Sequence, residues 1–299
     1  RYMNAHPVLL DVEYGTSLIT PAILEEGIKQ YPDVKYLVIV HFGGHPAEMV
    51  NSNGSGILDI CRKRGIKILE DAAHAFPASI NGRMVGSFGD ITCFSFYANK
   101  TITTGEGGML TTEDEELYRR VKIMRLHGID RDVWDRFTSD KPSWEYDVVA
   151  PGFKYNMPDL NAAIGLAQLE QGDAFREERM KIAEFYLTEL ADCKALDLPL
   201  THVKKKEHAW HLFPLVLNSN APISRNKFIE LMSEAGIGTS VHYKPLFRLK
   251  YYRETYKLSE QDFPNAERTW QGTVSLPIYP GLTKDEQAYI VDTVKKLLS

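Results

Sequence analysis

A carboxylate and a lysine follow two separate strands that the sequence predicts in its first half. Asp71 comes directly after the apolar run 66–70, and Lys100 follows the run 91–96. Open α/β sheets bind ligands at the carboxyl ends of their strands, so both side chains are expected to face one crevice. Such a pair suits pyridoxal phosphate, because the lysine forms a Schiff base and the carboxylate keeps the pyridine nitrogen protonated.

Neighbouring residues strengthen this interpretation. His74 is expected to lie flat against the cofactor ring, Ser95 to offer its hydroxyl to the phosphate, and the glycines of the turn 103–108 to let the backbone turn tightly. Each signal has a plainer explanation, since most lone lysines are surface charges and an aspartate after a strand is often a helix cap. Only their order and spacing together favour a cofactor site.

The elements that must position these residues alternate between strand and helix patterns. We expect strands at 7–12, 35–40, 66–70, 91–96 and 108–111, the first of them buried on both faces. One helix should end at a left-handed Gly65, and another should span 114–127 with Leu117, Val121 and Met124 on a buried face. Alternation of this kind predicts an α/β fold with a mainly parallel sheet and helices on both faces.

The second half of the chain has a different pattern. Helical periodicity runs from Asp159 toward Leu190 with a break near Gly172. It is followed by a strand at 212–217, a helix at 224–236, a strand at 239–243 and a last helix that opens with a capping box at 283–286. We therefore expect a large cofactor-binding domain over 1–160, and a linking helix with a smaller α+β domain over 161–299.

Composition excludes several classes of protein. The 299 residues carry 40 acidic and 35 basic side chains, a net charge of −5, so no basic field attracts nucleic acid. No apolar run approaches the roughly 18–20 residues that span a membrane. The three cysteines are widely separated, as in reduced cytoplasmic proteins. His41 and His45 have the spacing of a metal pair, but the glycines between them make a helix improbable and no third ligand is evident.

Several motifs closely resemble the pyridoxal-phosphate sugar aminotransferases of the DegT/StrS family. They are Glu-Asp-Ala-Ala-His at 70–74, Ser-Phe-Tyr-Ala-Asn-Lys at 95–100 and Thr-Thr-Gly-Glu-Gly-Gly at 103–108, with further matches at 40–49 and 154–163. The resemblance extends from about Pro7 to the C-terminus. Segments 208–213, 223–225, 236–243 and 250–254 are similar to the branch that aminates UDP-linked 4-keto sugars, including the enzyme that makes UDP-4-amino-4-deoxy-L-arabinose.

The resemblance implies a fold-type I aminotransferase and a role for each matching residue. Lys100 would be the Schiff-base lysine, Asp71 the partner of the pyridine nitrogen, His74 the stacking residue and Ser95 a phosphate ligand. Asn156 would reach the cofactor phosphate of the neighbouring subunit in a homodimer with shared sites. The implied substrates are glutamate and a nucleotide-linked keto sugar. His242 is the first candidate on the substrate side, with packing at a strand end as the alternative.

Other readings stay open. Some relatives dehydrate deoxysugars and carry a histidine where this chain has Lys100, which favours transamination. Family members also carry, before the equivalent of Pro7, a Ser-Gly-Thr turn at a helix N-terminus that binds the cofactor phosphate. The chain opens at Arg1 without this motif, so we expect an N-terminal portion to be absent. A truncated member that no longer holds the cofactor is a further alternative.

Overall fold

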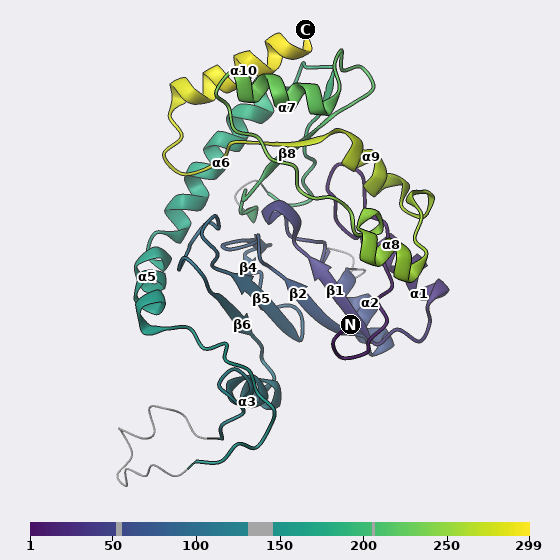
Figure 1. The fold of residues 1–299 in the computed structure, drawn as a ribbon, viewed down its shortest axis with the longest axis vertical. Coiled ribbons are helices and arrows are strands. Elements are labelled where there is room, and N and C mark those ends of the chain that lie inside the picture. Colours follow the sequence, from purple (N-terminus) through teal and green to yellow (C-terminus); the bar gives the residue numbers. More distant parts are fainter. Residues whose placement is uncertain (52–55, 131–145, 205–206) are drawn as a thin grey trace.

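The computed structural model describes residues 1–51, 56–130, 146–204 and 207–299. Its main sheet, at the centre of Figure 1, has the strand order β1 (Tyr36–Val40), β2 (Lys67–Asp71), β5 (Ile91–Ser95) and β6 (Gly108–Thr111). The pairs β1–β2 and β2–β5 are parallel, whereas β6 pairs antiparallel with β5. The α/β class is thereby confirmed, and the reversal at β6 arises because the chain from 96 to 107 turns back as a hairpin loop.

One face of this sheet is covered by two helices. α1 (Pro21–Gln30) and α2 (Ile57–Arg64) pack their apolar residues against the inward side chains of β1 and β2. The burial of β1 alternates strictly, so Leu37 and Ile39 are buried while Val38 on the other face is 57% exposed. As expected, α2 ends at a left-handed Gly65 with a φ of 67°.

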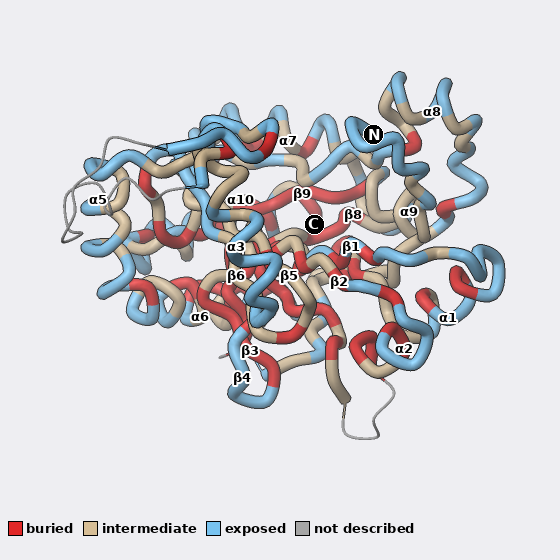
Figure 2. The backbone as a smooth tube through the Cα atoms, turned by 90° about the horizontal axis from the view of Figure 1, so that it is seen from below, coloured by how far each residue is buried: buried red, intermediate tan, exposed pale blue. Residues whose placement is uncertain are grey.

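A second body of structure is built on an antiparallel sheet with the strand order β7 (Leu196–Asp197), β8 (Phe213–Leu217) and β9 (Thr273–Leu276). Its helices α6 (Gly172–Glu189), α7 (Arg225–Glu234) and α10 (Lys284–Leu298) enclose a separate apolar core that includes Trp210, Tyr186 and Phe213. Figure 1 shows α6 running from the side of the main sheet up to α7 and α10. Figure 2 shows β8 and β9 as largely buried strands, and Figure 1 shows β8 above β1 and β2. The other strands and α-helices are β3 (Ser79–Ile80), β4 (Arg83–Met84), α3 (Glu115–Met124), α5 (Asp159–Leu169), α8 (Lys250–Tyr256) and α9 (Pro264–Gly272).

Local signals placed most of the helices of the second half correctly. The predicted break near Gly172 separates α5 from α6. Ser224 caps α7 by accepting a hydrogen bond from the backbone N–H of Lys227. Thr283 and Glu286 form the predicted capping box of α10.

Three local predictions are wrong. Residues 7–12 form no strand, and Asp11 instead accepts hydrogen bonds at 2.9 Å from the backbone N–H groups of Asn265 and Ala266 at the start of α9. The segment 239–243 pairs only through Ser240, because the chain leaves β9 after one bridge. α3 has no buried residue, since it lies below the end of the sheet rather than across its face (Figures 1 and 2).

Two further findings concern the cysteines and the helices. Cys61, Cys93 and Cys193 are all free thiols. Among the helices that the structure describes, none combines the length and the apolar character needed to cross a lipid bilayer.

Candidate active site

Asp71 is the last residue of β2, the strand that lies between β1 and β5. Its side chain points to the face opposite the helix-covered core, where it is half-buried. One carboxylate oxygen accepts a hydrogen bond at 3.1 Å from the backbone N–H of Ala73. The other oxygen has no hydrogen bond to a described residue, so the carboxylate retains capacity for a ligand.

Lys100 lies in the loop that joins β5 to β6. Two backbone hydrogen bonds of 2.9 Å close the base of this loop, one from Phe96 N–H to the Gly107 carbonyl and one from Thr104 N–H to the Phe96 carbonyl. Gly107 has a φ of 156°, and a Cβ at this position would lie 2.3 Å from Oγ1 of Thr104. The glycine is therefore required for a tightly closed loop that holds Lys100 beside the sheet.

Helix α5 supports the same loop from its side. The amide nitrogen of Asn161 donates to the carbonyl oxygens of Thr104 at 2.6 Å and Glu106 at 3.1 Å. Gln168, two turns further along, accepts from the backbone N–H of Thr103 at 3.3 Å. The lysine loop is thus tied both to itself and to α5.

A pocket joins the end of β2, the lysine loop and the second body of the molecule, and its lining includes His74, Ser95, Lys100 and His211. Burial lowers the pKa of the Lys100 amine, and the neighbouring Asp71 carboxylate opposes that shift. Burial, followed by the charges of Lys100 and His242, lowers the pKa of His74 to about 3. His74 is therefore a neutral ring beside an amine and a carboxylate.

Both ring nitrogens of His74 have hydrogen-bond partners. Nδ1 accepts from the backbone N–H of Gly43 at 3.3 Å, and Nε2 lies 3.3 Å from the hydroxyl oxygen of Tyr243. The Tyr243 ring lies 6.0 Å from the His74 ring at an interplanar angle of 28°, and the His211 ring lies 4.5 Å away on another side. Phe42 completes this aromatic group, with its ring 6.2 Å from His74.

The segment 207–212 docks the second body onto the loop that follows β1. The backbone N–H groups of Ala209 and Leu212 donate to the carbonyls of Gly44 and Gly43 at 2.9 and 3.0 Å. A Cβ on Gly44 would lie 2.9 Å from Cβ of Ala209 and 3.0 Å from the His74 carbonyl oxygen, so this close approach requires glycine. The Gly-Gly pair in the motif at 40–49 therefore serves the docking of the two bodies.

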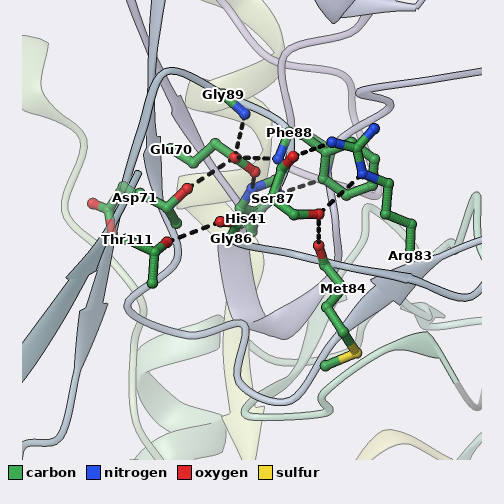
Figure 3. A network of polar contacts seen from close by, with 12 residues as sticks. His41, Glu70, Asp71, Arg83, Met84, Gly86, Ser87, Phe88, Gly89 and Thr111 are labelled. Atoms are coloured by element: carbon green, nitrogen blue, oxygen red, sulfur yellow. Dashed lines mark hydrogen bonds and ion pairs between the residues drawn. The ribbon is translucent and has the colours of Figure 1, made fainter. Parts of the chain in front are cut away.

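A fully buried polar network lies under the site, on the core face of β2 (Figure 3). Nε2 of His41 donates to the Glu70 carboxylate at 2.9 Å, because Nδ1 of His41 already accepts from the Ala47 N–H. Glu70 also accepts from Gly89 N–H at 2.6 Å and from the Thr92 hydroxyl at 2.9 Å. These contacts join β1, β2 and β5 directly beneath Asp71.

The two histidines with the spacing of a metal pair, His41 and His45, each have protein partners. His41 bonds to Glu70, and Nε2 of His45 accepts from the backbone N–H of His202 at 2.9 Å. Among the residues that the structure describes, no group of three or more His, Cys, Asp or Glu side chains is arranged to hold a metal ion.

Three of the predicted site residues, His74, Ser95 and Lys100, line one pocket, and the fourth, Asp71, is close enough to Lys100 for its charge to act on the pKa of the amine. Ser95 lines the pocket, and its hydroxyl accepts from the Tyr97 N–H at 3.3 Å. His242 is half-buried and close enough for the Lys100 charge to lower its pKa, after the larger effect of burial. Its Nδ1 contacts the Ser275 hydroxyl at 2.8 Å, so both alternatives stated for it stay open.

Asn156 precedes α5 and is not part of the loop that carries Lys100. The Asn156 side-chain oxygen accepts from Lys154. A role for Asn156 at a neighbouring subunit's site stays a prediction.

Sequence reasoning missed Phe42, His211 and Tyr243, although all three lie within motifs quoted for the family resemblance. Their relation to His74 depends on docking between distant segments.

The chain matches the model of the DegT/DnrJ/EryC1/StrS aminotransferase family over residues 1–295. It is 44% identical over its full length to the uncharacterized protein MJ1066 of Methanocaldococcus jannaschii, covering 75% of that protein. It is 40% identical over 99% of its length to the spore coat polysaccharide biosynthesis protein SpsC of Bacillus subtilis, again covering 75% of the relative.

Similarity to a solved structure agrees with these matches. The putative sugar aminotransferase Spr1654 of Streptococcus pneumoniae, in its PMP form, superimposes with a TM-score of 0.85 at 30% identity. The match covers 99% of this chain and 77% of that one. The same protein has also been solved in its PLP form.

Proposed function

Because the chain belongs to the DegT/DnrJ/EryC1/StrS family of pyridoxal-phosphate-dependent sugar aminotransferases, we propose that it moves an amino group from glutamate to a nucleotide-linked keto sugar. The observation that carries this proposal is the Lys100 amine held in one pocket with a neutral His74 and electrostatically coupled to Asp71. Family membership supports a sugar as the acceptor. The UDP-4-keto sugar is a prediction from the resemblance at 208–254.

The residues present fit the cofactor of the family. Pyridoxal phosphate needs an amine for its aldehyde, an anion near its pyridine nitrogen, a flat surface for its ring and donors for its phosphate. Lys100, Asp71, His74 and Ser95 offer these groups in that order, and Asp71 has an oxygen that no described residue occupies. When bound, the cofactor supplies an electron sink for the reacting carbon.

Each of these residues then has a defined task. Lys100 would hold the cofactor through Nζ and, when released, would move a proton to and from the reacting carbon. Burial lowers the pKa of its amine, although the Asp71 charge opposes that shift, and a lowered pKa favours the neutral amine that acts as a base. Asp71 holds the proton on the pyridine nitrogen. His74 contributes a ring without charge, so it does not repel the cationic pyridinium. Ser95 donates its hydroxyl to the phosphate.

His242 is proposed as the substrate-side residue. It comes from the second body of the molecule, and burial followed by the Lys100 charge lowers its pKa, which supports a position close to the amine. Its Nδ1 is engaged with Ser275, so Nε2 would be the atom that contacts the sugar. We also propose the division into a cofactor-binding domain over 1–160 and a smaller domain over 161–299. Two separate apolar cores support it.

We also propose a homodimer with shared sites, in which Asn156 contacts the cofactor phosphate of the neighbouring subunit. The support is a run of exposed apolar side chains on α5, the helix that braces the lysine loop. Leu160 is 81% exposed and Leu166 68% exposed, and exposed apolar patches of this kind mark protein contacts. Leu160→Glu should lower the mass measured by sedimentation, whereas the control Met84→Glu on exposed β4 should leave it unchanged.

The central experiment follows the absorbance of the protein with pyridoxal phosphate, before and after adding glutamate. We expect binding of the cofactor, a spectral change with glutamate, and attachment to Lys100 after borohydride reduction, located by peptide mass. Lys100→Ala should lose attachment and turnover, while Lys29→Ala, an exposed lysine of α1, should retain both. Attachment elsewhere contradicts the assignment of Lys100. A bound cofactor that does not respond to glutamate contradicts transamination and favours dehydration.

A further inference from the structure

Tyr243 brings a hydroxyl group from the second body of the molecule to the ring of His74. The two residues are 169 positions apart, and the Tyr243 oxygen lies 3.3 Å from Nε2 of His74. The two rings are within 28° of parallel. The phenol is 55% exposed, so its position is not dictated by core packing.

The hydrogen bonds of His74 define the direction of this contact. Nδ1 accepts from the Gly43 N–H, so it carries no proton in the neutral ring. The single ring proton is then on Nε2, which donates to the Tyr243 oxygen. Protonation of Nδ1 would set two N–H groups against each other, and the low pKa of His74 agrees with a ring that stays neutral.

Tyr243 is itself held from two sides. The preceding His242 contacts the Ser275 hydroxyl of β9 at 2.8 Å, and Ser240 forms a backbone bridge to the same serine. On the opposite side, the Phe42 ring meets the Tyr243 ring edge-on at 6.4 Å. The hydroxyl is therefore positioned by the small sheet and by the loop after β1 together. It accepts from His74 and retains its own proton for donation to another acceptor.

We propose that Tyr243 is a positioning residue that orients the His74 ring for the cofactor. Through Tyr243, the docking of the second body onto the loop after β1 also determines the orientation of that ring. This inference rests on the proposed role of His74 as the residue that lies against the cofactor. The sequence motifs draw attention to His242, but the side chain that reaches the His74 ring is the next one along.

The test is a double-mutant cycle with Tyr243→Phe, His74→Phe and the double variant. Each change keeps an aromatic ring and removes the hydrogen bond. Affinity for pyridoxal phosphate is measured by absorbance titration. We expect Tyr243→Phe to weaken binding roughly 3- to 10-fold, the usual value of one hydrogen bond, and to have no further effect when His74 is already Phe. The matched control is Tyr289→Phe, which removes a hydroxyl that donates to the Ala235 carbonyl at 3.0 Å in the same body.

A second measurement needs no cofactor. In ¹⁵N-histidine spectra, the Nε2 resonance of His74, assigned by its loss in His74→Phe, should shift in Tyr243→Phe and stay in place in Tyr289→Phe. An unchanged resonance, or an equal loss of affinity in both His74 backgrounds, would overturn the inference. Failure of the wild-type protein to bind pyridoxal phosphate would instead contradict the proposed function, and the resonance would still decide whether Tyr243 bonds His74.

Discussion

The two faces of β2 place two adjacent carboxylates in opposite environments. Glu70, on the core face, has no exposed surface and accepts hydrogen bonds from His41, Gly89 and Thr92. Asp71, one residue later on the other face, is half-buried, and from the described part of the chain its carboxylate accepts one hydrogen bond, from the Ala73 N–H. Figure 3 shows His41, Phe88 and Gly89 gathered around the Glu70 carboxylate.

The comparison assigns different purposes to two adjacent residues, with Glu70 stabilising the fold and Asp71 available for a ligand. Burial raises the pKa of Glu70, but the hydrogen bonds from His41, Gly89 and Thr92 outweigh it and hold the pKa below its usual value. With a fourth hydrogen bond from the Phe88 N–H at 3.3 Å, this buried carboxylate has no exposed surface left for a ligand and serves to stabilise the sheet. Asp71 keeps acceptor capacity beside Lys100, which is what a ligand-binding carboxylate needs. Alternation of side chains along a strand is the physical cause of this separation.

Glu70→Ala should have the largest effect. It leaves the donors of His41, Gly89 and Thr92 buried without an acceptor, and we expect a loss of about 3–5 kcal/mol in the free energy of unfolding. Urea titration followed by circular dichroism measures this loss. Glu70→Gln keeps the size and one acceptor oxygen, so a smaller loss is expected. A Glu70→Ala protein as stable as wild type would remove the distinction between the two faces.

Asp71→Asn should have the opposite result, with a large loss of activity and little change in stability. Without the negative charge at the pyridine nitrogen, kcat/KM should fall about 10²- to 10³-fold, as is typical when a preorganised electrostatic group is removed. The urea midpoint should stay close to that of wild type, because the amide can still accept from Ala73 N–H. Steady-state kinetics with glutamate and a keto-sugar panel measures the first quantity. Retained activity would argue against the assigned role.

Acid should weaken the docking of the two bodies before it protonates Glu70. Burial lowers the pKa of His45 to about 3 and that of His211 to about 2, so both are neutral in the fold. A histidine whose pKa is lower in the folded than in the unfolded protein does not reduce stability above the unfolded pKa near 6.5, where both forms are neutral. Below that pH the unfolded protein takes up the proton and the folded protein does not, so stability is lost progressively as the pH falls toward 3. At pH 5 each such histidine should contribute a loss of up to about 2 kcal/mol. Urea midpoints at pH 7 and pH 5 measure the change, and equal midpoints would contradict it.

Thr92→Val should have the smallest effect. The change removes one donor to Glu70 and keeps a β-branched side chain in β5, so about 1 kcal/mol of stability should be lost. Activity should persist, because the hydroxyl lies on the core face. The comparison of Thr92→Val with Glu70→Ala would show how much of the Glu70 network depends on a single donor.

The local and the family patterns in the sequence determined much of this protein. Capping residues located the ends of α2, α7 and α10, and the alternation of apolar runs with helices established the α/β class. The order of Asp71, His74, Ser95 and Lys100 along the chain was enough to place them at one crevice, because consecutive parallel strands end at the same edge of a sheet. These features depend on residues close together in the sequence.

Only the tertiary structure decided which distant residues meet at that crevice. Tyr243 contacts His74 because the small sheet docks on the loop after β1, and no periodicity within either segment encodes that approach. The same holds for Asp11, which caps α9 instead of standing in the strand that its apolar neighbours predicted. Local propensity reflects the conformational preferences of a few neighbouring residues, whereas these contacts follow from the packing of whole elements that are far apart along the chain.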